Sequence, residues 1–196
     1  METEKLYYQD PFLREFIGKV LSCEPGKSGW LITLDRTAFY PEGGGQPYDT
    51  GVLGGIHVLE VHTRADAIVH TCDAPLTPGQ QVSGTIDWER RFDLMQQHSG
   101  EYIVSGLAHA KYGCDNVGFH MGSDVITIDL NVELDQTQLE ELEAEVNRYL
   151  WQDRPTQILY PTAQELEHID YRSKKAIDGQ VRIVTFPGAD TCACCG

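Results

Sequence analysis

The sequence predicts an α+β protein of two domains: a small N-terminal antiparallel β-barrel that carries a glycine-rich motif (residues 1–88), then an α+β domain (residues 89–196). Three observations predict this organisation. Short β-rich runs separated by glycine continue to about Trp88. From Glu89 the apolar residues recur at helical spacing instead. Beyond Gly113, strand-like and helical patterns are mixed, which is typical of an α+β domain.

The first domain contains five runs with the composition of β-strands. Valine, isoleucine, threonine and aromatic residues are frequent in them, and glycine or proline lies between most of them. We therefore expect a small antiparallel barrel or sandwich. The runs cover residues 17–23, 30–35, 56–63, 67–72 and 81–88.

The second domain begins with a predicted helix from Glu89 to about Gly113, because apolar residues fall on one of its faces. Two strands, 116–122 and 125–131, are expected next. Asp135 is a candidate N-cap for a second helix that ends near Gln152. A strand over 155–160, a helical turn over 163–168 and a strand over 182–186 complete the pattern. From the second helix, the apolar residues expected to face the core are Leu139, Leu142, Val146 and Leu150.

The overall charge excludes a protein that holds nucleic acid by bulk positive charge. Fifteen lysines and arginines against thirty aspartates and glutamates give a net charge of −15, so any contact with RNA must be local. Hydrophobic residues make up 41% of the chain, yet no run approaches the roughly 20 apolar residues that span a bilayer. The first residues also lack the features of a secretion signal, so we expect a cytoplasmic protein.

The first candidate site is the glycine run Gly43, Gly44 and Gly45, followed by Gln46. Three glycines allow backbone conformations that are closed to other residues and let a ligand approach closely. The Gln46 amide then offers both a donor and an acceptor. The alternative reading is a flexible hairpin loop.

The second and third candidates are possible metal ligands. His98 and Tyr102 are spaced i, i+4, so on a helix both side chains point into the same space. A tyrosine is a poor metal ligand, and the alternative for His98 is an ordinary helix histidine. Cys192, Cys194 and Cys195 crowd the end of the chain. They are either metal ligands or an exposed, oxidisable tail.

Four motifs in this order resemble the AlaX family, freestanding alanyl-tRNA editing proteins similar to the editing domain of alanyl-tRNA synthetase. The motifs are D-x-T-x-F-Y-P-E-G-G-G-Q-P from Asp35, R-R-F-D-L-M-Q-Q-H-S-G-E from Arg90, V-G-F-H-M-G from Val117 and D-T-C-A-C-C-G from Asp190. The resemblance implies a trans-editing hydrolase that acts without ATP and serves translation fidelity. Its expected substrate is tRNA(Ala) mischarged with serine, less often with glycine.

The resemblance also implies a zinc ion, held by an H-x-x-x-H pair and by the cysteine and histidine of a C-x-x-x-H motif. His98 matches the first histidine and Cys194 matches the cysteine, whereas Tyr102 stands where the second histidine should be. The final histidine would fall two positions beyond Gly196. Two of the four expected ligands are therefore present, which is fewer than zinc sites usually have.

The resemblance gives roles to residues outside the metal site. Thr37 is the candidate that recognises the serine hydroxyl, Gln46 is expected to orient the substrate or the attacking water, and His120 is expected to line the same cleft. Gly43, Gly44, Gly45, Arg90 and Arg91 are the expected substrate-binding residues. Taken as residues alone, the pairs Arg90-Arg91 and Lys174-Lys175 either contact tRNA phosphates or serve surface solubility.

Two other readings remain. A non-catalytic tRNA-binding or regulatory relative could keep the fold and lose its metal, which Tyr102 favours. The residues Cys192 to Cys195 could instead form a separate redox or metal-sensing tail.

Overall fold

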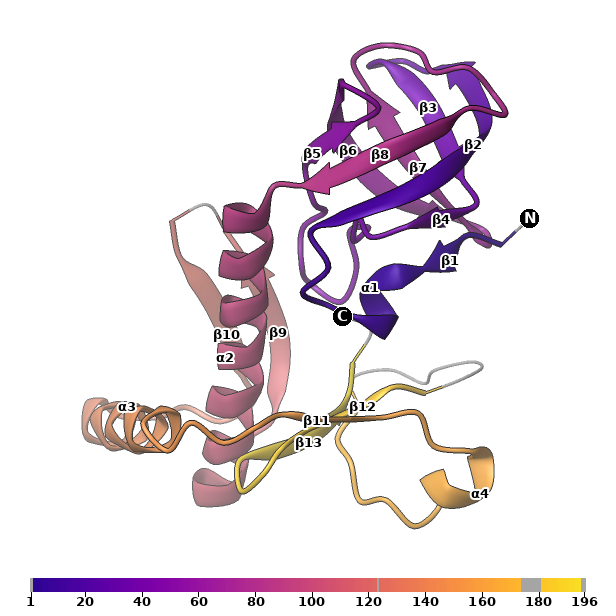
Figure 1. Cartoon of the computed structure of the whole chain (residues 1–196). Helices are drawn as coiled ribbons and strands as arrows, with labels where there is room; N and C mark the ends of the chain where they lie inside the picture. Colours follow the sequence, from indigo (N-terminus) through magenta and orange to yellow (C-terminus); the bar gives the residue numbers. More distant parts are fainter. Residues whose placement is uncertain (1, 123, 174–180, 195–196) are drawn as a thin grey trace. The chain divides into compact units, whose positions relative to one another are not determined.

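The computed structural model describes residues 2–122, 124–173 and 181–194 (Figure 1). The chain forms two compact units that divide between Met95 and Gln96, inside the long helix α2 (Trp88–Tyr112). The sequence places the boundary earlier, where this helix begins. The predicted mixture of helices and mostly antiparallel sheets is confirmed.

In unit 1, six antiparallel strands close into a barrel in the order β2-β3-β7-β6-β5-β8 (Figure 1). Buried and exposed residues alternate along β2 and β8, which is the pattern of strands with one face in a core. Ile32 and Leu34, which belong to this core, are fully buried. The strands are β2 (Glu15–Pro25), β3 (Trp30–Leu34), β5 (Gly51–Leu53), β6 (Ile56–Arg64), β7 (Ala67–Cys72) and β8 (Gln81–Ile86).

The sequence analysis missed the shortest elements of unit 1. These are β1 (Glu4–Lys5), α1 (Leu6–Gln9), β4 (Arg36–Thr37) and β5. Each has only two to four residues, too few for a periodic pattern to be recognised. Strand β4 pairs in parallel with β1, a long-range contact that no local pattern encodes.

Unit 2 contains the rest of α2, a hairpin, a second helix and a small sheet (Figure 1). Antiparallel strands β9 (Asn116–Met121) and β10 (Ile126–Leu130) form the hairpin. The sheet has the order β11-β12-β13. Its strands and the short helix before β12 are β11 (Gln157–Leu159), α4 (Ala163–Leu166), β12 (Ile183–Phe186) and β13 (Asp190–Ala193), of which β13 was not predicted.

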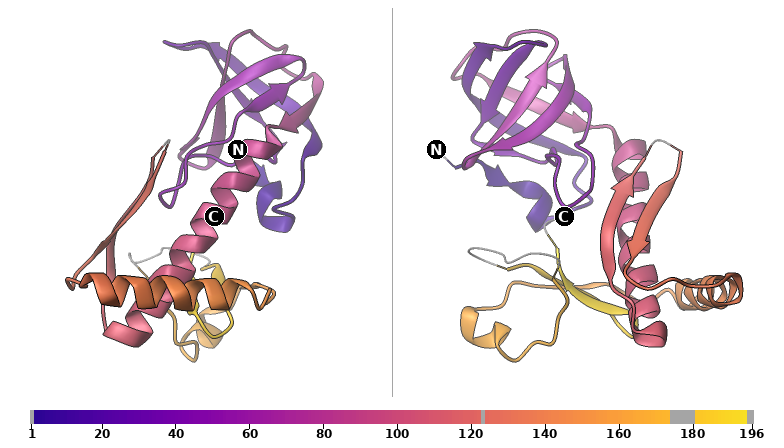
Figure 2. Two further views of the ribbon diagram at one scale, coloured as in Figure 1. Left: turned by 90° about the vertical axis from the view of Figure 1, so that its left-hand side faces the viewer. Right: turned by 180° about the vertical axis from the view of Figure 1, so that it is seen from behind.

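Helix α3 (Gln136–Leu150) begins as predicted. The Asp135 side chain accepts a hydrogen bond from the Gln138 amide at 2.9 Å, and the Gln138 side chain accepts one from the Asp135 amide at 2.9 Å. Near the C-terminal end of α2, the Tyr112 hydroxyl donates to the Gln138 carbonyl of α3. Helix α3 crosses this end of α2 (Figure 2).

The predicted core face of α3 is partly wrong. Leu142 is buried, but Leu139 and Leu150 are 45% and 50% exposed. Tyr149 is buried in their place. Among the described residues, no helix is long and apolar enough to cross a membrane.

Candidate active site

The glycine run forms a tight turn in unit 1. Gly43 and Gln46 exchange backbone hydrogen bonds of 3.1 and 3.0 Å. Between them, Gly44 and Gly45 have φ angles of +61° and +85°. Positive φ at both central positions defines a type I′ turn, which residues with a side chain rarely adopt. Two of the three glycines are therefore required by the turn itself.

The residues around the turn are buried and hydrogen-bonded. The Gln46 side chain is only 4% exposed, so its amide is held in place and does not swing in solvent. The Tyr40 hydroxyl donates to the Gly43 carbonyl at 3.2 Å. Tyr40 and Asp49 close the base of the loop, because the Asp49 amide donates to the Tyr40 carbonyl and the Tyr40 amide donates to Asp49 Oδ2. The glycine loop, residues 40–49, is thus a closed structure.

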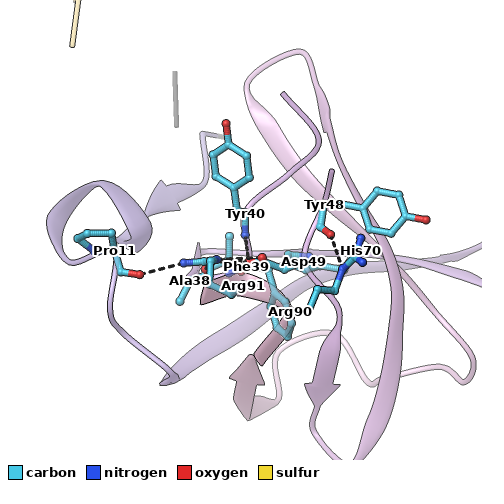
Figure 3. A network of polar contacts seen from close by, with 10 residues as sticks. Pro11, Ala38, Phe39, Tyr40, Tyr48, Asp49, His70, Arg90 and Arg91 are labelled. Atoms are coloured by element: carbon cyan, nitrogen blue, oxygen red, sulfur yellow. Dashed lines mark hydrogen bonds and ion pairs between the residues drawn. The ribbon is translucent and has the colours of Figure 1, made fainter. Parts of the chain in front are cut away.

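A buried arginine fastens this loop to helix α2 (Figure 3). Arg91 Nε donates to both Asp49 oxygens at 2.9 Å, and Arg91 Nη2 also contacts Asp49 Oδ2. Arg91 Nη2 donates to the Ala38 carbonyl at 2.6 Å and Arg91 Nη1 to the Pro11 carbonyl at 3.1 Å. Both charged side chains are at least 97% buried. The Arg91 guanidinium thereby fixes both ends of the glycine loop, Ala38 just before it and Asp49 at its end.

The predicted contact between Arg91 and tRNA is therefore wrong. Its guanidinium is directed into unit 1 and is occupied by a carboxylate and two carbonyls, so it is not presented to a phosphate. Arg90 is half-exposed and donates to the Tyr48 carbonyl at 3.2 Å. Of the two arginines, only Arg90 remains a candidate for phosphate contact.

Thr37 lies beside a histidine that the sequence analysis did not select. Thr37 Oγ1 is 2.9 Å from His70 Nε2, and His70 Nδ1 is 3.1 Å from the Ile32 carbonyl. A carbonyl only accepts, so Nδ1 carries the proton of this ring. Burial lowers the pKa of His70 to about 4, so the ring is neutral at pH 7. Nε2 must then accept, and the Thr37 hydroxyl donates to it.

The Thr37 hydroxyl therefore has a fixed polarity. It donates to His70 and accepts a hydrogen bond from the Phe39 amide at 3.1 Å. Its remaining lone pair can only accept. The whole Thr37 side chain is buried, with 0% exposure, so a ligand reaches this oxygen only when covering groups move.

The expected metal ligands of unit 2 lie together. Cys194 Sγ is 3.8 Å from His98 Nε2. This is close to the distance of about 3.6 Å between a thiolate and an imidazole that share a tetrahedral zinc. The Tyr102 ring stacks on His98, with ring centroids 5.2 Å apart and planes inclined by 17°. Burial raises the pKa of Tyr102 above its usual value, so the phenol stays protonated at neutral pH.

The described residues supply fewer ligands than a zinc site usually has. Within the described part of the chain, no group of three or more His, Cys, Asp or Glu side chains converges on one point. His98 and Cys194 supply two ligands, whereas catalytic zinc sites usually have three protein ligands and structural sites four. A protonated phenol is not an equivalent third ligand.

His120 is not brought to this pair. The ring of Phe119, its neighbour in β9, lies 5.9 Å from that of His98. Adjacent strand residues point to opposite faces, so His120 points away from His98, and it is exposed. Its register partner on β10 is Thr127. The expectation that His120 lines the cleft together with Thr37 and Gln46 stays a prediction.

Several sequence predictions lie outside the described residues or were incomplete. Lys174, Lys175 and Cys195 fall outside the described ranges. Inside them, Cys23, Cys72, Cys114 and Cys192 are free thiols. Asp49 and His70 were missed because their roles depend on partners 42 and 33 residues away. An aspartate just after the glycine motif was the only local signal.

Comparisons with known proteins agree with the motif order. The family model described as tRNA synthetases class II (A) matches residues 5–90. The alanyl-tRNA editing protein Aarsd1 of Mus musculus is 34% identical over 97% of this chain and 50% of its own length. The alanyl-tRNA editing protein AlaX-L of Pyrococcus horikoshii is 33% identical over 99% of this chain and 50% of its own length.

A synthetase also matches the chain. The alanine-tRNA ligase of Pyrococcus abyssi is 35% identical over the whole of this chain and 22% of the ligase. The chain spans about half the length of the editing proteins it matches. The resemblance drawn from the four motifs is confirmed.

The first prediction concerns the buried pair in unit 1. Arg91→Met leaves the Asp49 carboxylate buried without its partner, so we expect the free energy of unfolding to fall by about 3–5 kcal/mol. The matched control is Arg90→Met, which removes a half-exposed neighbour and should cost less than about 1 kcal/mol. Urea titration followed by circular dichroism measures both. Equal losses would contradict the assigned role of Arg91.

The second prediction concerns pH. Between pH 6.5 and about 4, the His70 imidazole binds a proton in the unfolded chain but stays neutral in the folded chain. The free energy of unfolding therefore falls as the pH falls through this window. The loss from this residue is up to ~3 kcal/mol. The variant His70→Gln has no imidazole at this position and so lacks this pH-dependent loss of stability. The difference in unfolding free energy between wild type and variant should therefore shrink from pH 7 to pH 4; a constant difference would refute the buried neutral state.

Proposed function

Because the chain is homologous to alanyl-tRNA editing proteins along nearly its whole length, we propose that it is a trans-editing hydrolase. Its substrate is tRNA(Ala) mischarged with serine, and less readily with glycine. The reaction is hydrolysis of the ester between the amino acid and the terminal ribose. The observation that carries this proposal is the alignment of nearly the whole chain with proteins of that name.

The proposed chemistry depends on positioning rather than on a strong nucleophile. The aminoacyl ester is intrinsically labile, so orienting the ester and a water molecule supplies much of the acceleration. The type I′ turn at Gly44 and Gly45 leaves the backbone uncovered by side chains, and the buried Gln46 amide provides a donor and an acceptor beside it. Water is the proposed nucleophile, since Ser99 lies next to His98 on a helix and adjacency does not orient a nucleophile and a base.

We further propose Thr37 as the residue that selects serine. Its hydroxyl donates to His70, so toward a substrate it acts as an acceptor. A serine hydroxyl can donate to that acceptor, and an alanine methyl group cannot. Because the threonine is fully buried, this contact requires the groups that cover it to move when substrate binds.

The zinc-assisted form of this reaction is not carried by the described residues. His98 and Cys194 alone are too few ligands for the proposed reaction to include a metal. A metal held by a complete set of ligands would supply Lewis-acid polarisation or an activated water. Arg90 is the proposed phosphate contact in unit 1, and it must act locally because the chain is acidic.

A non-catalytic tRNA-binding or regulatory role is the second candidate. The observation that favours it is the Tyr102 ring, which stacks on His98 where a second metal ligand would be expected. This role predicts tRNA binding without deacylation.

The third prediction tests the activity. In single-turnover assays, this chain should deacylate seryl-tRNA(Ala) faster than the spontaneous rate, and a chelator should not change that rate. The Tyr102→His variant is assayed beside it. Activity in the variant alone would favour the non-catalytic role for this chain. Inactivity of both proteins would refute the editing proposal.

The fourth prediction tests selectivity. Thr37→Val keeps the shape of the side chain and removes the acceptor, so preference for seryl- over alanyl-tRNA(Ala) should fall roughly 5- to 150-fold, the equivalent of about 1–3 kcal/mol. Thr37→Ser keeps a hydroxyl and should retain most of the preference. Unchanged selectivity in Thr37→Val, in a variant whose melting temperature is near wild type, would remove Thr37 from the site.

A further inference from the structure

Four aromatic rings form a continuous column inside unit 2. The Phe119 ring lies 5.9 Å from that of His98, His98 lies 5.2 Å from Tyr102, and Tyr102 lies 6.0 Å from Phe186. The last two pairs are stacked, with interplanar angles of 17° and 25°. Offset stacking at these separations is a favourable geometry for aromatic pairs.

The column connects three elements that are far apart in the sequence. Phe119 is on β9, His98 and Tyr102 are on α2, and Phe186 is on β12. His98 and Phe186 are 5% and 4% exposed. Tyr102 packs against the apolar core of this unit, and within the column its contact with Phe186 joins the helix to the sheet. The column therefore cross-links the hairpin, the helix and the sheet.

A metal would make the same kind of cross-link, since His98 and Cys194 come from α2 and from the end of β13. Only these two described ligands meet, and their Nε2 and Sγ atoms lie within 3.8 Å of each other. To act as a third ligand, the residue at position 102 must aim a donor atom at that pair. The Tyr102 hydroxyl is hydrogen-bonded to Cys194, but a phenol is a poor zinc ligand, and its ring lies nearly parallel to His98, between it and Phe186.

We propose that the aromatic column takes the place of a metal as the cross-link of unit 2, so that this chain folds and keeps His98 beside Cys194 without zinc. Tyr102 is the residue that converts the site from a metal-held to a ring-held junction. The inference concerns folding and metal content, so it stands or falls separately from the proposed editing activity.

The experiment first measures the unaltered chain. After purification, metal analysis should find far less than one zinc per chain, and its melting temperature should be the same, within ~1 °C, in EDTA and in added zinc. A stoichiometric zinc together with a melting temperature that falls in EDTA would overturn the proposal.

Variants at position 102 test the ring directly. Tyr102→Phe keeps the column and should melt within ~2 °C of wild type, whereas Tyr102→Ala should melt ~5 °C lower or more. Tyr102→His offers a third ligand and should bind about one zinc per chain, or cobalt with a visible thiolate band, and become sensitive to chelator. An unchanged melting temperature in Tyr102→Ala, or no metal uptake by Tyr102→His, would overturn the assignment of Tyr102 as the replacement for the metal.

Discussion

The arrangement of unit 1 depends on one buried ion pair. Arg91 sits on the first turn of α2 and holds Asp49, the Ala38 carbonyl and the Pro11 carbonyl at once. A guanidinium has five N–H donors in a fixed plane, so these acceptors must lie in fixed directions around it. Because a buried charge without its partner is strongly destabilising, the pair forces the glycine loop into one position relative to the helix.

The hydrogen bonds of the buried segment that leads into the glycine loop have fixed donors and acceptors. The chain of donors runs from the Phe39 amide to Thr37, and from Thr37 to His70 and the Ile32 carbonyl. Each atom in this chain has one possible role, because the carbonyl at its end can only accept. The segment that leads into the loop thus presents a fixed hydrogen-bonding pattern, which is what selection of a hydroxyl-bearing substrate requires.

In unit 2, stacked aromatic rings connect the hairpin, the long helix and the sheet. Small protein units often gain stability from a metal or a disulfide. Here Tyr102 lies between His98 and Phe186 and joins the helix to the sheet. His98 and Cys194, the residues that match the metal ligands implied by the resemblance, are neighbours, and Tyr102 between His98 and Phe186 is aromatic.

The sequence by itself determined the local features. Five barrel strands, the extent of α2 and the Asp135 cap follow from alternation, helical spacing and capping preference, all of which act within a few residues. The order of the four motifs also determined the family resemblance. The tertiary structure alone decided that Arg91 is a buried clamp, that His120 points away from His98, and that His70 sets the polarity of Thr37. Each of these features depends on a partner that folding brings close from a distant part of the sequence. The type of a side chain alone does not determine which residue that partner is.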